Sequence, residues 1–212
     1  MARTSAFTLL EILVAITIVS VLAATLAAAA GTFRQRAEQM AGLQLLARIG
    51  TAIQQSAADR NALLPGPIWP GQVAEYDPTR AGRLVRMLAP YLEIEERSQK
   101  YVVNAWLSPA YRRKMGSIAP ADARVFVSNH AVETDPGASF SPWGNASLTG
   151  SDPVPLSRIP QPSKTWALCD ADQWQPAVAS APWKSSTPPN PIYGSTRNQL
   201  FFDGHVEIVP VN

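Results

Sequence analysis

The chain has 212 residues, a net charge of +2 and only 16% charged residues. Its longest basic cluster is Arg112-Arg113-Lys114, so it lacks the positive field that nucleic-acid binding requires, and we expect no nucleic-acid partner. Cys169 is the single cysteine, which excludes an internal disulfide and leaves packing to stabilise the fold.

The first predicted element is an apolar segment, residues 7–30, in which Glu11 is the only charged residue. A helix rises about 1.5 Å per residue, so more than 20 such residues cross a hydrocarbon layer of about 30 Å. Arg3 is the only charged side chain ahead of this segment, and an ordinary removed signal peptide fits poorly. A carboxylate costs about 2.5–3.5 kcal/mol at the centre of a membrane helix and less near its end, so we expect Glu11 to have a partner.

The same helix is predicted to continue from Phe7 to about Ser56, because apolar residues recur at spacings of three and four after the membrane segment. All 19 prolines follow Leu64, so none interrupts it. The apolar stripe needs a covering layer, and a sheet is the natural one. Three glycines are the expected points of bending: Gly31, Gly42 and Gly50.

The remainder predicts a small head rich in turns. A second helix is expected over residues 81–98. Short strands are expected at residues 101–103, 124–128, 165–169, 198–202 and 205–209. Short strands late in a chain favour an antiparallel sheet, so the predicted fold class is α+β. Residues 170–197 are predicted to form a long surface loop.

Asp203-Gly204 stands between two apolar runs, which predicts a two-residue hairpin with a type I′ turn. Both residues of such a turn have positive φ, so their predicted role is structural.

The candidates for catalysis or metal binding lack a recognised ligand spacing, and no Gly-x-Ser-x-Gly elbow occurs. They are Asp170, Asp172, Asp203, His205, His130 and Cys169. We therefore expect no catalytic residues, no enzyme activity and no cofactor. One alternative stays open, a calcium site at Asp170 and Asp172, because their oxygen atoms flank the long loop and suit that ion.

The string from Arg3 to Val14 resembles the leader and first turns of type IV pilins and of the pseudopilins of type II secretion. In those families a peptidase cuts a short basic leader before Phe or Met, the new amino terminus is methylated, and Glu stands at mature position five. The resemblance implies cleavage between Ala6 and Phe7, methylation of Phe7 and a role for Glu11 in assembly. Ala6 departs from the usual Gly at the cut.

The segment from Tyr193 to Val206 resembles the end of a bacterial family that has a prepilin-type amino terminus and an H-x9-DG processing-associated domain. The matching residues are Gly194, Asn198, Leu200, Phe201, Asp203 and Gly204. Tyr193 stands where that family has His. Residues 57–150 match poorly.

Together these features predict a leader at residues 1–6, a transmembrane helix at 7–31, its extramembrane continuation at 32–56 and an α+β head at 57–212. The resemblance implies a structural subunit of a pilus or of a type II secretion-like fibre. It would lie in the bacterial inner membrane as a single-pass protein, with a cytoplasmic amino terminus and a periplasmic head. Its expected partners are prepilin peptidase, other pilin-like subunits contacted through the helix, and inner-membrane lipid. The alternative is a membrane-anchored binding domain or enzyme that never polymerises.

Overall fold

The computed structural model describes residues 8–135 and 137–211. The chain divides into two compact units, Met1–Ala37 and Glu38–Asn212.

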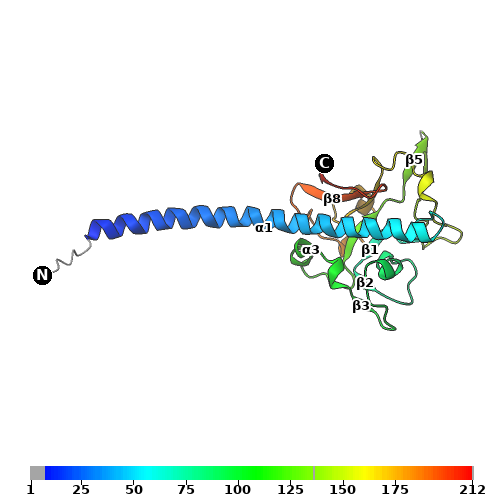
Figure 1. Ribbon diagram of the computed structural model, residues 1–212, viewed down its shortest axis with the longest axis horizontal. Helices are drawn as coiled ribbons and strands as arrows, with labels where there is room; N and C mark the ends of the chain where they lie inside the picture. Colours follow the sequence, from blue (N-terminus) through cyan, green and yellow to red (C-terminus); the bar gives the residue numbers. More distant parts are fainter. Residues whose placement is uncertain (1–7, 136, 212) are drawn as a thin grey trace. The chain divides into compact units, whose positions relative to one another are not determined.

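The longest element is helix α1, Leu9–Asp59, whose course is drawn from blue to cyan in Figure 1. Its amino-terminal part is long and apolar enough to cross a membrane, and none of that stretch is buried within the chain. Four hydroxyls in this part donate to carbonyl oxygens three or four residues earlier at 2.7–2.9 Å, so they are satisfied without water. They belong to Thr17, Ser20, Thr25 and Thr32. These features fit a protein anchored in a membrane by one helix.

The helix ends three residues later than predicted, at Asp59. Asn61 and Ala62 then adopt positive φ angles of 55° and 64°, and the backbone N–H of Ala62 donates to the oxygen of Ala57 at 2.8 Å. This left-handed turn satisfies a carbonyl at the helix end and reverses the chain.

The head contains a five-stranded antiparallel sheet in the order β1-β4-β7-β8-β9. Its strands are β1 (Gly71–Val73), β4 (Arg124–Ser128), β7 (Trp166–Asp170), β8 (Thr196–Phe201) and β9 (Val206–Pro210). The predicted α+β class, with an antiparallel sheet after a long helix, is confirmed. Two small sheets were not predicted: β2 (Glu75–Tyr76) pairs with β3 (Tyr101–Val102), and β5 (Val132–Asp135) with β6 (Ala138–Phe140). Of these strands only β3 was predicted, at residues 101–103, and it lies outside the five-stranded sheet.

The predicted helix over residues 81–98 is wrong. The structure has only the single turn α2, Leu84–Met87, followed by the 3₁₀ turn η1, Ala89–Tyr91. Pro90 lacks the N–H that an α-helix needs in its interior, and Glu93 has a φ of 55° that ends the helical path. The other short helices are η2 (Asn104–Trp106), α3 (Pro109–Lys114), η3 (Leu156–Arg158), α4 (Pro176–Ala179) and η4 (Lys184–Ser186).

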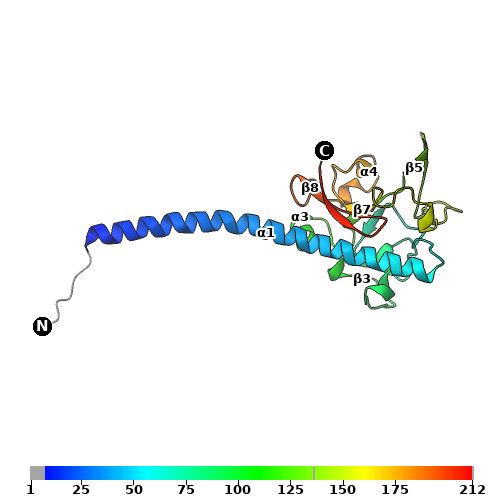
Figure 2. The same cartoon turned by 45° about the horizontal axis from the view of Figure 1, so that its top comes forward.

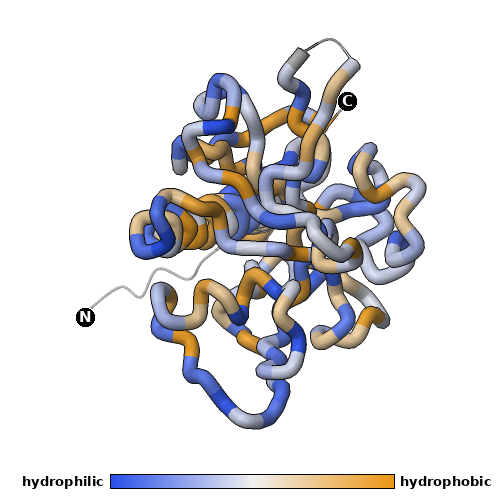
Figure 3. The backbone as a smooth tube through the Cα atoms, turned by 90° about the vertical axis from the view of Figure 1, so that its right-hand side faces the viewer, coloured by the Kyte–Doolittle hydropathy of each residue, from blue (hydrophilic) through white to orange (hydrophobic). Residues whose placement is uncertain are grey.

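The core of the head lies between the carboxyl-terminal part of α1 and the sheet. Leu46 and Ile49 of α1 are fully buried with Leu168 of β7 and Leu200 of β8. Figure 2 shows this part of the helix beside β8 and β7, and Figure 3 shows hydrophilic stretches in the peripheral loops of the head. The head thus supplies the covering layer that the apolar stripe requires.

The hairpin between β8 and β9 differs from the predicted type I′ turn. Gly204 N donates to Phe201 O at 3.0 Å and Phe201 N donates to His205 O at 2.9 Å, so the loop has three residues. Gly204 has a φ of +96°, whereas Asp203 does not have the positive φ that a type I′ turn requires of both its central residues. Phe202 explains the extra residue, because it is buried in the core with its ring centroid 5.3 Å from that of Trp143. The structural role of Gly204 is that of a bulge residue.

Candidate functional site

The predicted cleavage and methylation positions, Ala6 and Phe7, lie outside the described residues. Both assignments stay predictions. Glu11, the third predicted residue of this group, lies in the first turn of α1 and is exposed.

Glu11 has a partner within its own chain. Thr8 precedes α1, and its backbone N and its Oγ1 both donate to Glu11 Oε2, at 2.8 and 2.9 Å. In return, Glu11 N donates to Thr8 Oγ1 at 3.2 Å. This reciprocal pattern is a capping box, which satisfies two backbone N–H groups that the start of a helix leaves without partners.

This capping box was not predicted, although the Thr-x-x-Glu spacing before an apolar run is its ordinary signal. The box places the carboxylate at the helix amino terminus, where the helix dipole favours negative charge. Thr8 is therefore a partner of Glu11 within its own chain. Pairing with a neighbouring subunit stays a prediction.

The carboxyl-terminal motif residues meet α1 inside the head. Asn198 on β8 is fully buried, its side-chain Nδ2 donates to Gln39 O of α1 at 3.2 Å, and its backbone N donates to Asp170 Oδ2 at 2.7 Å. Tyr193 is buried, and its hydroxyl donates to Ser108 Oγ at 3.2 Å. Gly194 follows with a φ of +83°.

Gly42 and Gly50 of α1 have a packing role in this region that was not predicted, and bending at these positions stays a prediction. A Cβ atom on Gly42 would lie 2.1 Å from Tyr193 Oη and 2.7 Å from Asn198 Nδ2. A Cβ atom on Gly50 would lie 2.7 Å from Leu200 Cδ1. The helix comes this close to the strand only because both positions lack a side chain.

We call this contact the helix–strand seam: Gln39, Gly42, Gly50 and Gln54 of α1 against Tyr193, Thr196, Asn198, Leu200 and Phe202. Gln39 Nε2 donates to Thr196 Oγ1 at one end, and Gln54 Nε2 donates to Phe202 O at the other, both at 2.9 Å. From Gln39 to Gln54 the helix advances about 22 Å. From Thr196 to Phe201 strand β8 advances about 17 Å, so the helix and the strand run in the same direction over a similar length.

Asp170 and Asp172, the residues of the calcium alternative, lie in different polar contacts. Asp172 accepts two hydrogen bonds from Arg197, at 2.6 Å from Nε and 2.8 Å from Nη2, and both side chains are buried. Burial raises the pKa of Asp170 to about 7, although the bond from Asn198 N opposes the shift. Among the residues that the structure describes, no group of three or more His, Cys, Asp or Glu is arranged to hold a metal ion. Calcium binding stays an untested prediction.

Of the remaining candidates, Cys169 directly precedes Asp170 on β7 and lines the same cavity as His130. His130 lies beside a cavity of about 700 Å³, and its Nε2 and Nδ1 are 3.0 and 2.8 Å from the hydroxyls of Ser128 and Ser141. Burial lowers its pKa to about 4, so the ring is neutral near pH 7. Cys169 is buried, which raises its pKa, and a protonated thiol is a poor nucleophile. His205 lies on the hairpin, stacked on Phe201 with ring centroids 4.3 Å apart.

Comparison with known proteins identifies the amino-terminal part of the chain. Residues 1–27 match the family described as the prokaryotic N-terminal methylation motif. No curated protein and no solved structure matches the chain. The resemblance of residues 193–206 to an H-x9-DG domain stays a prediction. The matched motif, together with the apolar helix that follows it, indicates a pilin-like protein that prepilin peptidase processes.

Proposed function

We propose that this protein is a structural subunit of a pilus or of a type II secretion-like fibre. One observation carries the proposal: a prepilin methylation motif leads directly into a helix whose apolar part is exposed within the described chain. Such a surface needs lipid around the single subunit and other apolar helices in a fibre. The proposed assembly partners are therefore copies of this chain or similar subunits.

In the proposed location the apolar part of α1 crosses the inner membrane, with the amino terminus in the cytoplasm and the head in the periplasm. After cleavage between Ala6 and Phe7, the new ammonium group would lie four residues before Glu11. In a fibre, this carboxylate would exchange its contact with Thr8 for the amino terminus of a neighbouring subunit. Opposite charges offset each other's desolvation cost in an apolar bundle, which gives assembly a defined register.

Processing is tested by mass spectrometry of the protein purified from cells that contain prepilin peptidase. The expected mass begins at Phe7 and carries one added methyl group. Ala6→Asp should leave the leader attached, because the resemblance implies that the peptidase needs a small residue there, whereas Ala6→Gly should be cut. Recovery of only the uncut parent chain would contradict the proposal.

Fibre formation is tested separately, by shearing the cells and asking whether mature protein enters the fibre fraction or crosslinks to other pilin-like subunits through α1. Mature protein that stays as a dispersed single-pass species in the membrane would favour the alternative, a binding domain that does not polymerise.

A further inference from the structure

The head has a second cavity, of about 500 Å³, whose walls include two indole rings, those of Trp69 and Trp183. Each ring packs on a glycine. A Cβ atom on Gly71 would lie 3.0 Å from three ring atoms of Trp183, and a Cβ atom on Gly82 would lie 2.9 Å from Cδ2 of Trp69. Both indoles therefore pack against backbone at positions where any side chain would crowd the ring.

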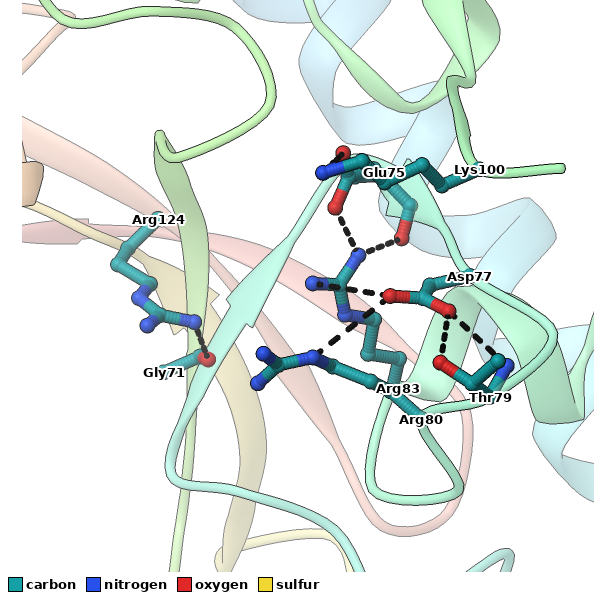
Figure 4. A network of polar contacts seen from close by, with 8 residues as sticks. All are labelled: Gly71, Glu75, Asp77, Thr79, Arg80, Arg83, Lys100 and Arg124. Carbon is teal, nitrogen blue, oxygen red and sulfur yellow. Dashed lines mark hydrogen bonds and ion pairs between the residues drawn. The ribbon is translucent and has the colours of Figure 1, made fainter.

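Three arginines also line this cavity, and two of them have acidic partners, as Figure 4 shows. Arg83 is almost buried and pairs with Glu75, and its Nη2 lies 3.8 Å from Asp77 Oδ2. Arg80 Nε lies 3.6 Å from the same Asp77 oxygen. Asp77 Oδ1 also accepts hydrogen bonds from the backbone N and the hydroxyl of Thr79, so both carboxylate oxygens of Asp77 have partners within this network.

Arg124, the third arginine, has a neutral partner. Its Nη1 donates to Gly71 O at 3.0 Å, drawn apart from the acidic network in Figure 4. Its Nε is buried and makes no hydrogen bond, and within residues 8–135 and 137–211 no carboxylate lies within ion-pair distance of it. Asp122 lines the same cavity from an exposed position.

Burial and the neighbouring positive charge of Arg83 lower the pKa of Arg124, and the negative charge of Asp122 only partly opposes the shift. A partly desolvated cation with an unused donor is unfavourable unless an anion joins it. The guanidinium also lies 5.9 Å from the centroid of the Trp183 ring, so an anion at Arg124 would lie close to an aromatic wall.

We propose that this cavity binds an acidic saccharide, with its carboxylate or phosphate on Arg124 and its sugar ring against the indole of Trp183. The volume fits a ring-sized ligand and is much larger than a lone phosphate needs. The C–H face of a sugar ring packs well on an indole, whose π face carries partial negative charge. Asn145 and Ser147, which also line the cavity, supply polar groups suited to sugar hydroxyls.

Binding is measured with the full chain in detergent micelles, by tryptophan fluorescence and by titration calorimetry. The probes are glucuronate, glucose 6-phosphate, glucose and inorganic phosphate. The first two should bind saturably and at least ~10-fold more tightly than the last two, because only they carry both charge and ring. Arg124→Gln should weaken their binding ~10-fold or more, the range of a charge-assisted hydrogen bond.

Arg112→Gln is the matched control, because the exposed Arg112 also donates to a backbone carbonyl, that of Asn104, outside the cavity. It should leave binding unchanged. Trp183→Leu should weaken the acidic sugars and not phosphate, and it tests the proposal independently if Arg124→Gln fails to fold. The proposal is overturned if no acidic sugar binds saturably, if glucose or phosphate binds equally well, or if the Arg124 and Arg112 variants behave alike.

Discussion

Asn198 joins strand β8 to helix α1 through Gln39, whose carbonyl oxygen accepts from Asn198 Nδ2 at 3.2 Å. The two residues are 159 positions apart in the chain and meet where Gly42 removes the side chain between helix and strand. The contact between Asn198 and Gln39 therefore lies beside a position, Gly42, where a methyl group would clash with Tyr193 and Asn198.

Gly42→Ala tests this dependence. Alanine in place of glycine normally stabilises a helix by about 0.5–1 kcal/mol. At Gly42 the new Cβ would meet Tyr193 Oη at 2.1 Å, so we expect a loss of about 1–3 kcal/mol instead. The measurement is the free energy of unfolding of the head, followed by near-ultraviolet circular dichroism.

Gly31→Ala is the matched control, because nothing lies within 4 Å of a Cβ atom at that position. It should leave the stability of the head unchanged. Tyr193→Phe combined with Gly42→Ala should recover part of the loss, since the nearest clashing atom is removed. Equal behaviour of Gly42→Ala and Gly31→Ala would show that the close approach has no energetic weight.

Gly204→Val tests the hairpin. A β-branched residue at a φ of +96° is strained, and we expect the head to lose about 1–3 kcal/mol. Gly204→Asn should lose less, since asparagine tolerates positive φ better. Glu207→Val on the neighbouring strand controls for added apolar bulk. An unchanged melting temperature for Gly204→Val would contradict the observed turn.

Helix α1 was predictable because its signals are local. Uninterrupted helical spacing without proline predicts α1 almost to its end, and the five strands of apolar character between residues 101 and 209 appear close to their predicted positions. The helix over residues 81–98 failed because Pro90 and the positive φ at Glu93 overrule its apolar spacing. Strands as short as Gly71–Val73 carry no alternation to detect.

The helix–strand seam and the three-residue turn were harder to predict from the sequence, because both depend on contacts between residues far apart in the chain or on the folded core. The packing role of Gly42 was not predicted because its partner, Tyr193, is distant in sequence and the close approach exists only in the folded head. Phe202 lengthened the predicted two-residue turn because the core takes up its ring beside Trp143. The Thr8–Glu11 capping box, in contrast, is local and was recognisable from the sequence.

Asp170 predicts a pH dependence of stability. Its pKa in the folded head is raised from 3.8 to about 7, so the fold favours the protonated form. The stability that protonated Asp170 contributes to the folded head is therefore fully present below pH 3.8 and is lost as pH rises through about 7. Asp170→Asn should therefore gain stability relative to the parent between pH 5 and 8, at up to about 1.4 kcal/mol per pH unit.

The measurement is chemical denaturation of both proteins across that range. Asparagine keeps an oxygen that accepts from Asn198 N, so the variant changes charge more than contact. His130 acts in the opposite sense, since its lowered pKa of about 4 costs stability as pH falls from 6.5, and it affects parent and variant alike. Parallel stability curves for the two proteins would contradict the raised pKa of Asp170.

Substitutions of Glu11 distinguish its two possible roles, charge pairing with a neighbouring subunit and helix capping with Thr8. Glutamine can replace glutamate in a capping box but carries no charge. If the carboxylate pairs with the amino terminus of a neighbouring subunit, both Glu11→Gln and Glu11→Leu should be cut and inserted, yet fail to enter the fibre fraction. If Glu11 serves only the box with Thr8, Glu11→Gln should assemble like the parent, and Glu11→Leu should lose about 0.5–2 kcal/mol of local helix stability. Thr17→Val is the control, because it removes a hydroxyl of the same apolar segment that bonds only to the helix backbone, and it does not alter the charge.

Cleavage of these variants is followed by mass spectrometry, insertion by membrane fractionation and assembly by shearing. Normal assembly of Glu11→Gln would rule out charge pairing as the basis of the proposed fibre, because the variant keeps every contact of Glu11 except the ionic one.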